Sequence, residues 1–368
     1  MKIEAFELRR LRIPLVKPFR TSFGTEDERD VLLVRAITPE AEGWGECVAL
    51  KEPIYSPEYA DGAQEVTNEY LIPRLYALTD VAASDVASAL EPIKGHQMAK
   101  AAVEMAVLDA ELRAQGVSFA RYLGAVREAV DCGVSVGIHD SIPALLDTVE
   151  GHIAEGYRRV KLKIEPGWDV EPVRATRERF GDIPLQVDAN TAYRLSDAAH
   201  LAELDAFDLL LIEQPLPEDE VLAHAELAKT VRTPICLDES ITSARAAVDA
   251  IALGACAIIN IKAGRVGGYL EAWKIHDVCS ERGVPVWCGG MLETGLGRAA
   301  NVALAALPNF TLPGDTSASD RYFHRDITEP FVLHDGRLRV PEGPGLGVEP
   351  IPEILDEYTT SSEIVKRG

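Results

Sequence analysis

Five charged side chains recur along the middle of the chain at steps of 24 or 25 residues. Each ends or closely follows a short apolar run, where a charge is locally unfavourable. One strand, one loop and one helix need about this many residues. The spacing therefore predicts one chemically active group at the end of each of five successive βα units. The five residues are Lys163, Asp188, Glu213, Asp238 and Lys262.

The three carboxylates of this series are predicted to lie side by side. Asp188, Glu213 and Asp238 would end the third, fourth and fifth strands of a parallel barrel, whose active sites lie at the carboxyl ends of the strands. Neighbouring strands are about 4.8 Å apart, so the three side chains can converge on one ion. An all-oxygen set selects a hard cation, and Mg²⁺ leaves positions for water and substrate. The alternative, three unrelated helix caps, would leave the mutual repulsion of the carboxylates uncompensated.

Lys163 and Lys262 are predicted to face each other across that ion, because the second and sixth strands of an eight-stranded barrel are diametrically opposed. Two opposed amines could remove a proton from one face of a carbon and return it to the other. Mg²⁺ bound to a carboxylate would acidify the adjacent carbon by stabilising an enediolate. Desolvation, the cation and Lys161, on the same strand face as Lys163, would lower the lysine pKa values. The alternative is that each lysine only forms a salt bridge with the carboxylates.

Three neighbouring residues are candidates for supporting roles. Asn190 could hydrogen-bond groups bound to the metal, or could cap the next helix. Glu239 directly follows Asp238 and would point away from the ion, into its outer layer of contacts. Arg265, three residues after Lys262, could keep the pKa of that lysine low, or could form an ion pair at the surface.

The first part of the chain differs from the rest. Apolar alternation predicts antiparallel strands over 3–13 and 30–36 and a third strand near 43–48. Helical spacing of apolar residues predicts a helix over 98–115. Residues 1–125 are therefore expected to form an α+β capping domain.

From Cys132 onward, strand patterns and helix patterns alternate, with helices expected over 243–253 and 268–282. This alternation predicts an α/β fold, a modified (β/α)8 barrel over residues 126–326. After residue 326 the alternation stops, and we expect residues 327–368 to return to the capping domain. The eight strands are expected to begin near Cys132, Val160, Pro184, Leu209, Pro234, Ala257, Val284 and Phe310.

Composition limits which partners the protein is expected to bind and in which cellular compartment it is expected to act. The 368 residues carry a formal net charge of −22, so we expect neither nucleic acid nor an anionic membrane as a partner. No apolar run has the length of a signal peptide core or a membrane span. Six widely spaced cysteines form no C-x-x-C pair and are interpreted as reduced, mostly buried thiols. We therefore expect a cytoplasmic protein that acts on a small carboxylate molecule.

The charged series resembles the enolase superfamily, in its muconate-lactonizing branch. The resemblance covers the whole chain and rests on Lys161-x-Lys163, Asp188, Glu213, Asp238-Glu239 and Lys262. Other segments are similar to the group of N-succinylamino acid (N-acylamino acid) racemases and o-succinylbenzoate synthases. They are Pro18–Gly24, Gly43–Cys47, Gly133–Gly137, Gly289–Gly295 and Leu312–Asp320.

The resemblance implies an isomerase that racemises N-acyl (N-succinyl) amino acids by 1,1-proton transfer through an enediolate. Lys163 and Lys262 would be the two bases, and the three carboxylates would bind Mg²⁺, for which Mn²⁺ or Co²⁺ could substitute. In the same group this site also dehydrates a cyclohexadiene carboxylate in menaquinone biosynthesis, with the second lysine acting mainly as a cation. The lyase activity, o-succinylbenzoate synthase, is thus the alternative, and one protein could carry both. The group is commonly homo-oligomeric.

The resemblance also implies a substrate pocket between the two domains. Loops of the capping domain near Phe19, Phe23 and Tyr55 would close over the substrate side chain; the alternative for each residue is core packing. The other residues expected to bind substrate are Lys161, Asn190, Ser135, Gly290 and Met291.

Other activities fit the sequence less well. A mandelate-type enzyme needs a histidine base after the seventh strand, and residues 284–290 contain none. Dipeptide epimerases typically place Asp-x-Asp at the eighth strand, but Asp315 is followed by Thr316 and Ser317. A Schiff-base aldolase would use a barrel lysine without a metal. A non-catalytic binding protein would not need two opposed lysines.

Overall fold

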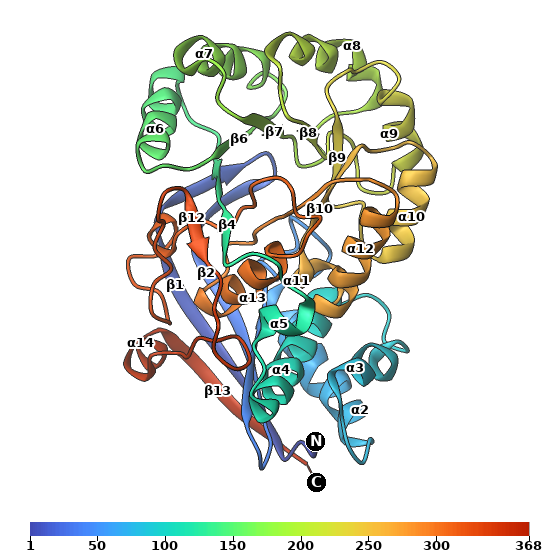
Figure 1. Ribbon diagram of the computed structural model, residues 1–368, viewed down its shortest axis with the longest axis vertical. Coiled ribbons are helices and arrows are strands. Elements are labelled where there is room, and N and C mark those ends of the chain that lie inside the picture. The colour runs from blue at the N-terminus through green and yellow to red at the C-terminus, as the bar shows by residue number, and fades with distance from the viewer. Residues whose placement is uncertain (368) are drawn as a thin grey trace.

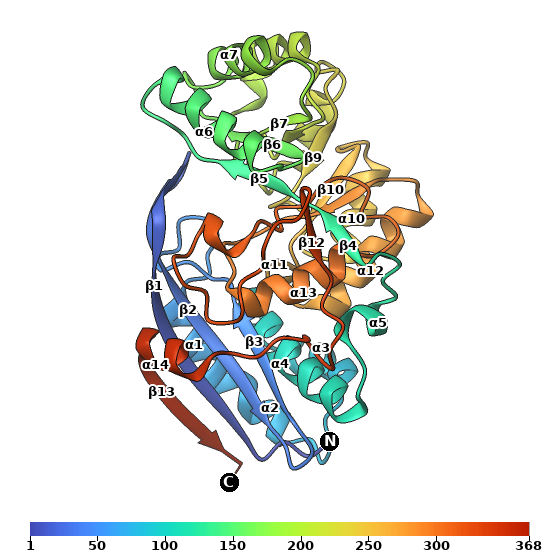
Figure 2. The same ribbon diagram turned by 60° about the vertical axis from the view of Figure 1, so that its left-hand side comes forward.

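The computed structural model describes residues 1–367, which form two units stacked along the long axis of the molecule (Figure 1). The lower unit in Figure 1 is an antiparallel sheet with helices packed on it, and the upper unit is a curled parallel sheet surrounded by helices (Figure 2). The predicted fold class, a barrel-like α/β unit with an α+β capping domain, is confirmed.

The capping sheet has the strand order β13-β1-β2-β3. β1 and β2 pair antiparallel from Ala5 opposite Ile37 to Thr21 opposite Gly24, so their connection forms a tight turn that reaches the barrel. β13, from the end of the chain, pairs antiparallel with the outer edge of β1. The strands are β1 (Ala5–Thr21), β2 (Gly24–Ile37), β3 (Glu42–Cys47) and β13 (Thr359–Lys366).

Helix α4 (Gln97–Gln115) is buried on most of its faces because it lies between the capping sheet and the barrel helices. A Cβ atom on Gly43 or Gly45 of β3 would collide with the α4 backbone, so these glycines permit the close approach of strand and helix. The predicted helix over 98–115 is confirmed to within one residue. The other capping helices are α1 (Ala60–Val66), the π-helix η1 (Thr67–Leu71), α2 (Ile72–Tyr76), α3 (Ala83–Leu90) and α5 (Phe119–Leu123).

The parallel sheet of the second unit has its strands in sequential order, β5 to β11. Its strands are short, buried and rich in Val, Ile and Leu, as expected when both faces of a parallel sheet are covered. The strands are β5 (Gly133–Val136), β6 (Arg159–Lys163), β7 (Leu185–Asp188), β8 (Ile212–Glu213), β9 (Ile235–Leu237), β10 (Ile258–Ile261) and β11 (Val286–Cys288).

The predicted eighth strand near Phe310 is wrong for the described chain. Residues 308–314 instead close the barrel through two isolated parallel bridges, Val286 with Phe310 and Cys132 with Gly314. Pro308 and Pro313 lie within this stretch. A proline lacks the N–H group that a central strand must donate to its neighbour, so a continuous ladder cannot form here.

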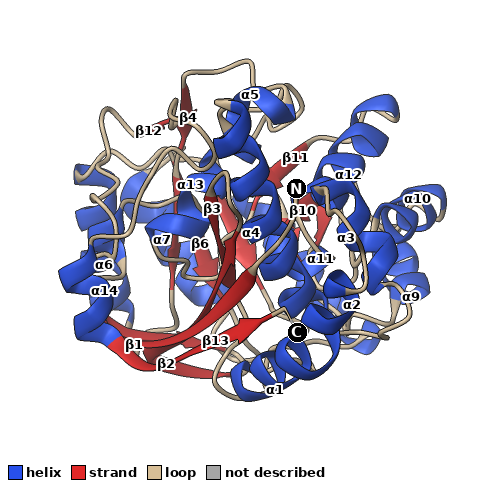
Figure 3. Cartoon of the chain, turned by 90° about the horizontal axis from the view of Figure 1, so that it is seen from below, coloured by secondary structure: helices blue, strands red, loops and turns tan. Residues whose placement is uncertain are grey.

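Helices follow the strands around the outside of the barrel, as Figure 3 shows from below. The predicted helices over 243–253 and 268–282 correspond to α10 and α12. The helices are α6 (Ile142–Ala154), α7 (Val170–Phe180), α8 (Ala198–Leu201), α9 (Val221–Leu227), α10 (Ala244–Ala252), α11 (Ala263–Val266), α12 (Tyr269–Glu281) and α13 (Gly295–Ala305).

The remaining elements are short, and some of them lie on the segments that join the two units. Residues Arg337–Arg339 pair with the strand just before β5 rather than with the capping sheet. Among the described residues, no helix has both the length and the apolar character that crossing a membrane requires. These elements are β4 (Ala129–Asp131), β12 (Arg337–Arg339), α14 (Pro352–Tyr358) and the 3₁₀ turns η2 (Leu195–Asp197), η3 (Ala202–Phe207) and η4 (Ser319–Arg321).

A buried carboxylate of the capping domain caps the barrel helix α13. Glu46, next to the end of β3, accepts hydrogen bonds from Thr294 N at 3.0 Å, Thr294 Oγ1 at 2.6 Å and Gly297 N at 3.0 Å. A carboxylate is favourable at this position because the first N–H groups of a helix have no intrahelical partner. Burial nevertheless raises the pKa of Glu46 to about 7.

Glu104 of α4 makes the second such contact. It faces the backbone at the start of α12, and burial raises its pKa to about 8 despite hydrogen bonds from Leu270 and Tyr269. Gly268 precedes α12 with φ 136°, and a Cβ there would collide with the Glu104 carboxylate. The capping domain is thus joined to the barrel through two helix N-termini.

We expect Glu46 to make the stability of the protein depend on pH. Its pKa is higher in the folded than in the unfolded chain, so the folded state loses stability as pH rises from about 4.5 to about 7. Glu46→Gln should reduce this loss by up to about 3 kcal/mol. Urea unfolding of both proteins at pH 5 and pH 8 measures the difference. Equal losses in wild type and variant would contradict the assignment.

Candidate active site

The charged series lies at one level across the carboxyl end of the parallel sheet. Lys163 on β6 is the register partner of Asp188 on β7, which is the partner of Glu213 on β8. Asp238 directly follows β9, and Lys262 directly follows β10. All five side chains are buried, and the three carboxylates are 0% exposed. The sheet therefore brings the predicted residues together at one end of the barrel.

The three carboxylates form ion pairs with basic side chains. Asp188 Oδ2 lies 2.7 Å from Lys163 Nζ, Glu213 Oε2 lies 3.0 Å from Lys161 Nζ, and Asp238 Oδ2 lies 2.7 Å from Lys262 Nζ. Within residues 1–367, no group of three His, Cys, Asp or Glu side chains is arranged to hold a metal ion. The convergence of the carboxylates on one ion thus stays a prediction, and the alternative of lysine–carboxylate pairing describes the contacts present.

The carboxylates nevertheless differ in how well their charge is compensated. Lys163 and Lys161 outweigh the effect of burial on Asp188 and hold its pKa below the usual value. Burial and repulsion from Asp188 raise the pKa of Glu213 well above its usual range, although Lys161 opposes this. Asn260 Nδ2 donates to the second oxygen of Glu213 at 2.6 Å. An additional positive charge beside Glu213 would therefore be stabilising.

A second layer of charges lies deeper on the same strand face. Lys161 Nζ contacts Asp315 Oδ2 at 2.7 Å and Asp188 Oδ2 at 3.2 Å. Arg159 Nη1, two residues earlier on β6, donates to Asp315 Oδ1 at 2.8 Å. Burial would lower the pKa of Lys161, but Asp315 and Glu213 outweigh it and raise the pKa well above 10.5. Lys161 is thus a fixed cation.

The two lysines predicted to act as catalytic bases have different hydrogen-bond partners. Lys163 Nζ donates to Asn190 Oδ1 at 2.7 Å, a contact within the barrel. Lys262 Nζ donates to Tyr55 Oη at 3.1 Å and lies 5.0 Å from the centre of the Tyr55 ring, so its partner comes from the capping domain. The expected lowering of the lysine pKa values includes the effect of a bound cation and stays a prediction. Burial lowers the pKa of Lys262, but Asp238 outweighs burial and raises it.

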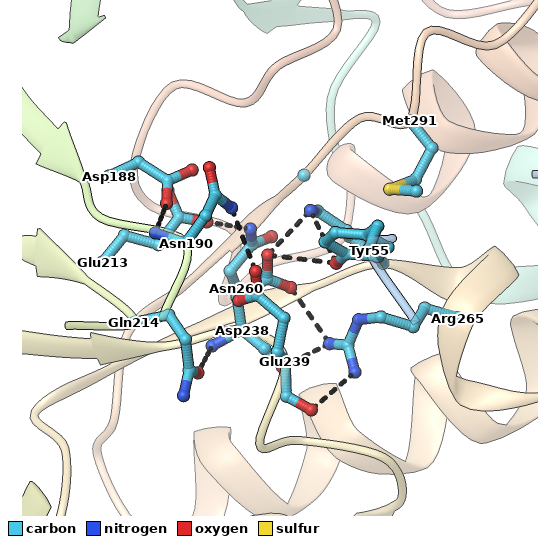
Figure 4. A network of polar contacts seen from close by, with 12 residues as sticks. Tyr55, Asp188, Asn190, Glu213, Gln214, Asp238, Glu239, Asn260, Arg265 and Met291 are labelled. Carbon is cyan, nitrogen blue, oxygen red and sulfur yellow. Dashed lines mark hydrogen bonds and ion pairs between the residues drawn. The ribbon is translucent and has the colours of Figure 1, made fainter. Parts of the chain in front are cut away.

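The three supporting residues lie in the same network (Figure 4). Asn190 Nδ2 donates to Glu239 Oε1 at 3.0 Å. The buried carboxyl of Glu239 lies close to Asp238, and burial with this repulsion raises the pKa of Glu239 to about 8. Arg265 is 6% exposed, so it does not lie at the surface; its Nη2 donates to Asp238 Oδ1 at 3.0 Å. It therefore shares Asp238 with Lys262.

Four residues of this network, Lys161, Lys163, Asn190 and Lys262, line a cavity of about 50 Å³ between the capping domain and the barrel. Lys163 and Lys262 both face it. The residues expected to bind substrate all line it too: Phe19, Phe23, Tyr55, Ser135, Lys161, Asn190, Gly290 and Met291. Among the described residues, the buried hydroxyl of Ser135 has no hydrogen-bond partner, so it is available to a bound molecule.

Six lining residues were not expected from the sequence: Thr21, Glu26, Leu50, Leu292, Asp315 and Tyr322. Asp315 lies about two further steps of 24 or 25 residues after Lys262, so the spacing of the charged residues could have predicted it as a site residue. Arg159, Lys161 and Lys163 occupy alternate positions of one strand and therefore share a face, which indicates an acidic partner opposite them. No comparable sequence pattern indicates that Glu26 and Tyr322 line the cavity.

The arrangement combines two amines that face one cavity with a cluster of buried carboxylate oxygens beside them. Amines can accept and donate protons once they are neutral. Clustered carboxylate oxygens with a fixed cation can bind a hard metal ion or an anionic group. The geometry therefore suits proton transfer at a carbon of a small carboxylate molecule.

Comparisons with known proteins identify the two units. Residues 4–124 match the mandelate racemase / muconate lactonizing enzyme N-terminal domain, and residues 144–354 match the enolase C-terminal domain-like family. The chain is 69% identical over 362 residues to an N-succinylamino acid racemase of Amycolatopsis, covering 98% of both chains. It is 46% identical over 369 residues to an o-succinylbenzoate synthase of Geobacillus kaustophilus, covering 100% of this chain and 98% of that one.

The fold is likewise shared with solved structures. A crystal structure of an enolase superfamily member from Listeria innocua superposes with a TM-score of 0.96 at 40% identity, covering 100% of each chain.

Removing the charge of Asp315 should destabilise the protein. Within residues 1–367 it is the carboxylate paired with the fully buried Arg159, so Asp315→Asn leaves a buried charge uncompensated. We expect a loss of about 3–5 kcal/mol in the free energy of unfolding. Asp356→Asn, which breaks an exposed pair with Arg9, is the control and should cost about 0–1 kcal/mol. Equal losses in urea unfolding would contradict this account.

Proposed function

We propose that this chain, which belongs to the enolase superfamily and within it to the mandelate racemase and muconate lactonizing enzyme family, racemises N-succinyl and other N-acyl amino acids. One observation carries the proposal: two buried lysines, on strands separated by three others in the curled sheet, face the same cavity. The 69% identical relative named N-succinylamino acid racemase supports the same reaction.

The proposed reaction exchanges the α-proton of the substrate between two bases. Lys163 would address one face of the α-carbon and Lys262 the other. A proton removed by one lysine and replaced from the other inverts the carbon. Asn190 would orient the Lys163 amine, and the Tyr55 hydroxyl would orient the Lys262 amine. Lys161, held between Asp188, Glu213 and Asp315, would supply a fixed positive charge for a substrate carboxylate.

The donor set fits a divalent metal ion. Asp188, Glu213 and Asp238 offer buried oxygens from three successive strands, and the raised pKa of Glu213 reflects negative charge that a cation would offset. We propose that these three residues hold Mg²⁺, for which Mn²⁺ or Co²⁺ could substitute. When bound, the ion would stabilise the negative charge that develops on the substrate carboxylate as the α-proton leaves.

The lysines must lose a proton to act as bases. Asp238 now raises the pKa of Lys262. A cation that binds the same carboxylates would compete with the lysines for those oxygens and would repel the ammonium form. Burial, which already acts to lower the pKa of Lys262, would then prevail. We therefore expect the Lys262 amine to become neutral, and so able to accept a proton, only when the carboxylates bind a metal.

Substrate entry requires the capping domain to move. The cavity of about 50 Å³ has room for only a few water molecules. An N-acyl amino acid is larger, so the loops that carry Phe19, Phe23 and Tyr55 must open to admit it. We propose that these residues then close on the substrate side chain.

A second candidate activity is the dehydration catalysed by o-succinylbenzoate synthases. The 46% identical relative that matches the whole chain carries that name, and the same two lysines suit a reaction that needs one base and one cation. Assaying both reactions with one enzyme preparation tests the proposal. We expect racemisation of an N-succinyl amino acid by polarimetry; loss of optical rotation no faster than without enzyme would refute the primary function.

Loss of any proposed metal ligand should abolish turnover without unfolding the protein. Asp188→Asn, Glu213→Gln and Asp238→Asn each replace a charged oxygen ligand by a neutral amide. We expect each to reduce kcat by about a hundredfold or more, with unchanged circular dichroism. Calorimetric titration with Mg²⁺ should show weakened binding in each variant. Activity that survives complete chelation of divalent metals would exclude this mechanism.

Arg265 should keep the pKa of Lys262 down, because its guanidinium shares Asp238 with that lysine. Arg265→Gln leaves Asp238 to Lys262 alone, so the pKa of Lys262 should rise further. The acid limb of the pH–rate profile, where the base takes up its proton, should therefore move to higher pH in the direction where Lys262 is the base. Arg245→Gln, which removes an exposed arginine, is the control. An unchanged profile in the Arg265 variant with activity intact would contradict the role.

A further inference from the structure

The loops that follow β6, β7 and β8 are joined to one another by hydrogen bonds. Ile164 N donates to Asp188 O at 2.9 Å, and Thr191 N donates to Gln214 O at 2.9 Å. Tyr193 N donates to Pro215 O at 3.1 Å. The loops that follow Lys163, Asp188 and Glu213 therefore form one hydrogen-bonded layer above the sheet.

Three side chains hold this layer from outside the cavity. Asp169 caps α7, with Val170 N donating to its Oδ1 at 2.6 Å. Its other oxygen accepts from the Tyr193 hydroxyl at 2.8 Å and from His200 Nε2 at 2.9 Å. Tyr193 is 1% exposed, whereas the His200 side chain is 44% exposed. We call Asp169, Tyr193 and His200 the loop clamp.

The loop between Asp188 and Tyr193 has a strained backbone. Asn190 has φ 41° and Thr191 has φ 65°, both in the left-handed region that is unfavourable for residues with a side chain. This conformation directs Asn190 Oδ1 to Lys163 Nζ at 2.7 Å. Such a conformation persists only if surrounding contacts hold it. Tyr193, at the end of the loop, provides the buried contact to Asp169.

The capping domain also contacts this loop. Ser22 Oγ donates to Ala189 O at 3.2 Å and to Asn190 O at 3.4 Å. These are bonds to carbonyl groups at the start of the loop, whereas the clamp acts at its end. The contacts of Lys262 are different: Tyr55 and Asp238 hold it, and neither belongs to the clamped loops.

We propose that Asp169, Tyr193 and His200 are positioning residues for proton transfer at Lys163 and not at Lys262. The inference rests on the proposed function, because it assigns one half of the two-base reaction to the clamp. The clamp holds the left-handed turn at Asn190, and Asn190 in turn holds the Lys163 amine. Loosening the clamp should therefore slow proton transfer at one face of the α-carbon and leave transfer at the other face unchanged.

The test measures exchange of the α-proton for deuterium, separately for each enantiomer of an N-succinyl amino acid, by NMR. The Lys163→Ala variant identifies the enantiomer whose proton Lys163 removes. In Tyr193→Phe we expect exchange of that enantiomer to fall on the order of ten- to a hundredfold, the effect of displacing a reacting group by up to about 1 Å. Exchange of the other enantiomer should not change.

Two further variants keep the test informative if Tyr193→Phe folds poorly. His200→Ala alters a partly exposed side chain and should show the same selective loss to a smaller degree. His200→Gln should restore exchange, because its amide can donate to Asp169. Tyr76→Phe is the matched control: it removes a tyrosine hydroxyl that binds Val365 O and Phe6 N in the capping domain, and both exchange rates should stay at wild-type values.

The possible outcomes separate the clamp from the function on which it rests. A selective loss in Tyr193→Phe or His200→Ala supports the clamp. Equal losses for both enantiomers, or no loss, would overturn it while leaving the racemase function standing. A wild-type protein that exchanges neither enantiomer would refute the proposed function and the clamp with it.

Discussion

The structure depends on compensating buried charge at the carboxyl ends of the barrel strands. Five carboxylates and five basic side chains are buried there, each less than 9% exposed, and burying an ion without a partner costs several kcal/mol. The pairing leaves no carboxylate of this group without a cation or a hydrogen-bond donor among the described residues, yet Glu213 and Glu239 keep raised pKa values. The group therefore has room for a further cation. The ten residues are Asp188, Glu213, Asp238, Glu239, Asp315, Arg159, Lys161, Lys163, Lys262 and Arg265.

This constraint explains why the barrel and the capping domain contribute different kinds of residue to the site. The barrel supplies all ten of these charged residues, because a parallel sheet brings the ends of successive strands to one edge. The capping domain supplies the apolar and hydroxyl groups that exclude water, Phe19, Phe23 and Tyr55, which strengthens each interaction inside. Of these, Tyr55 also contacts Lys262, so the position of the capping domain and the placement of this lysine are physically linked. Lys163 is held within the barrel by Asn190. The two lysines that we propose as bases are thus held by different parts of the structure.

Much of this site could be predicted from the sequence because the residue period of a βα unit is visible in the charges. The spacing alone places Lys163, Asp188 and Glu213 on neighbouring strands, and their register in the sheet agrees. The eighth strand could not be placed correctly from apolar pattern, because Pro308 and Pro313 remove the N–H donors that a strand needs. The pairing of Arg159 with Asp315, the raised pKa of Lys262 and the left-handed turn at Asn190 depend on contacts between distant parts of the chain. No local pattern reports such contacts, so they required the structure.

The central claim is that Lys163 and Lys262 act on opposite faces of one α-carbon. The most direct test replaces each lysine by alanine and follows racemisation and α-proton exchange of both enantiomers in deuterated water. The account predicts that neither variant racemises the substrate. Each should still exchange one enantiomer, and the retained enantiomers of Lys163→Ala and Lys262→Ala should be opposite. Racemisation at the wild-type rate by either variant, or equal exchange of both enantiomers by a single-lysine enzyme, would contradict the opposed-base assignment.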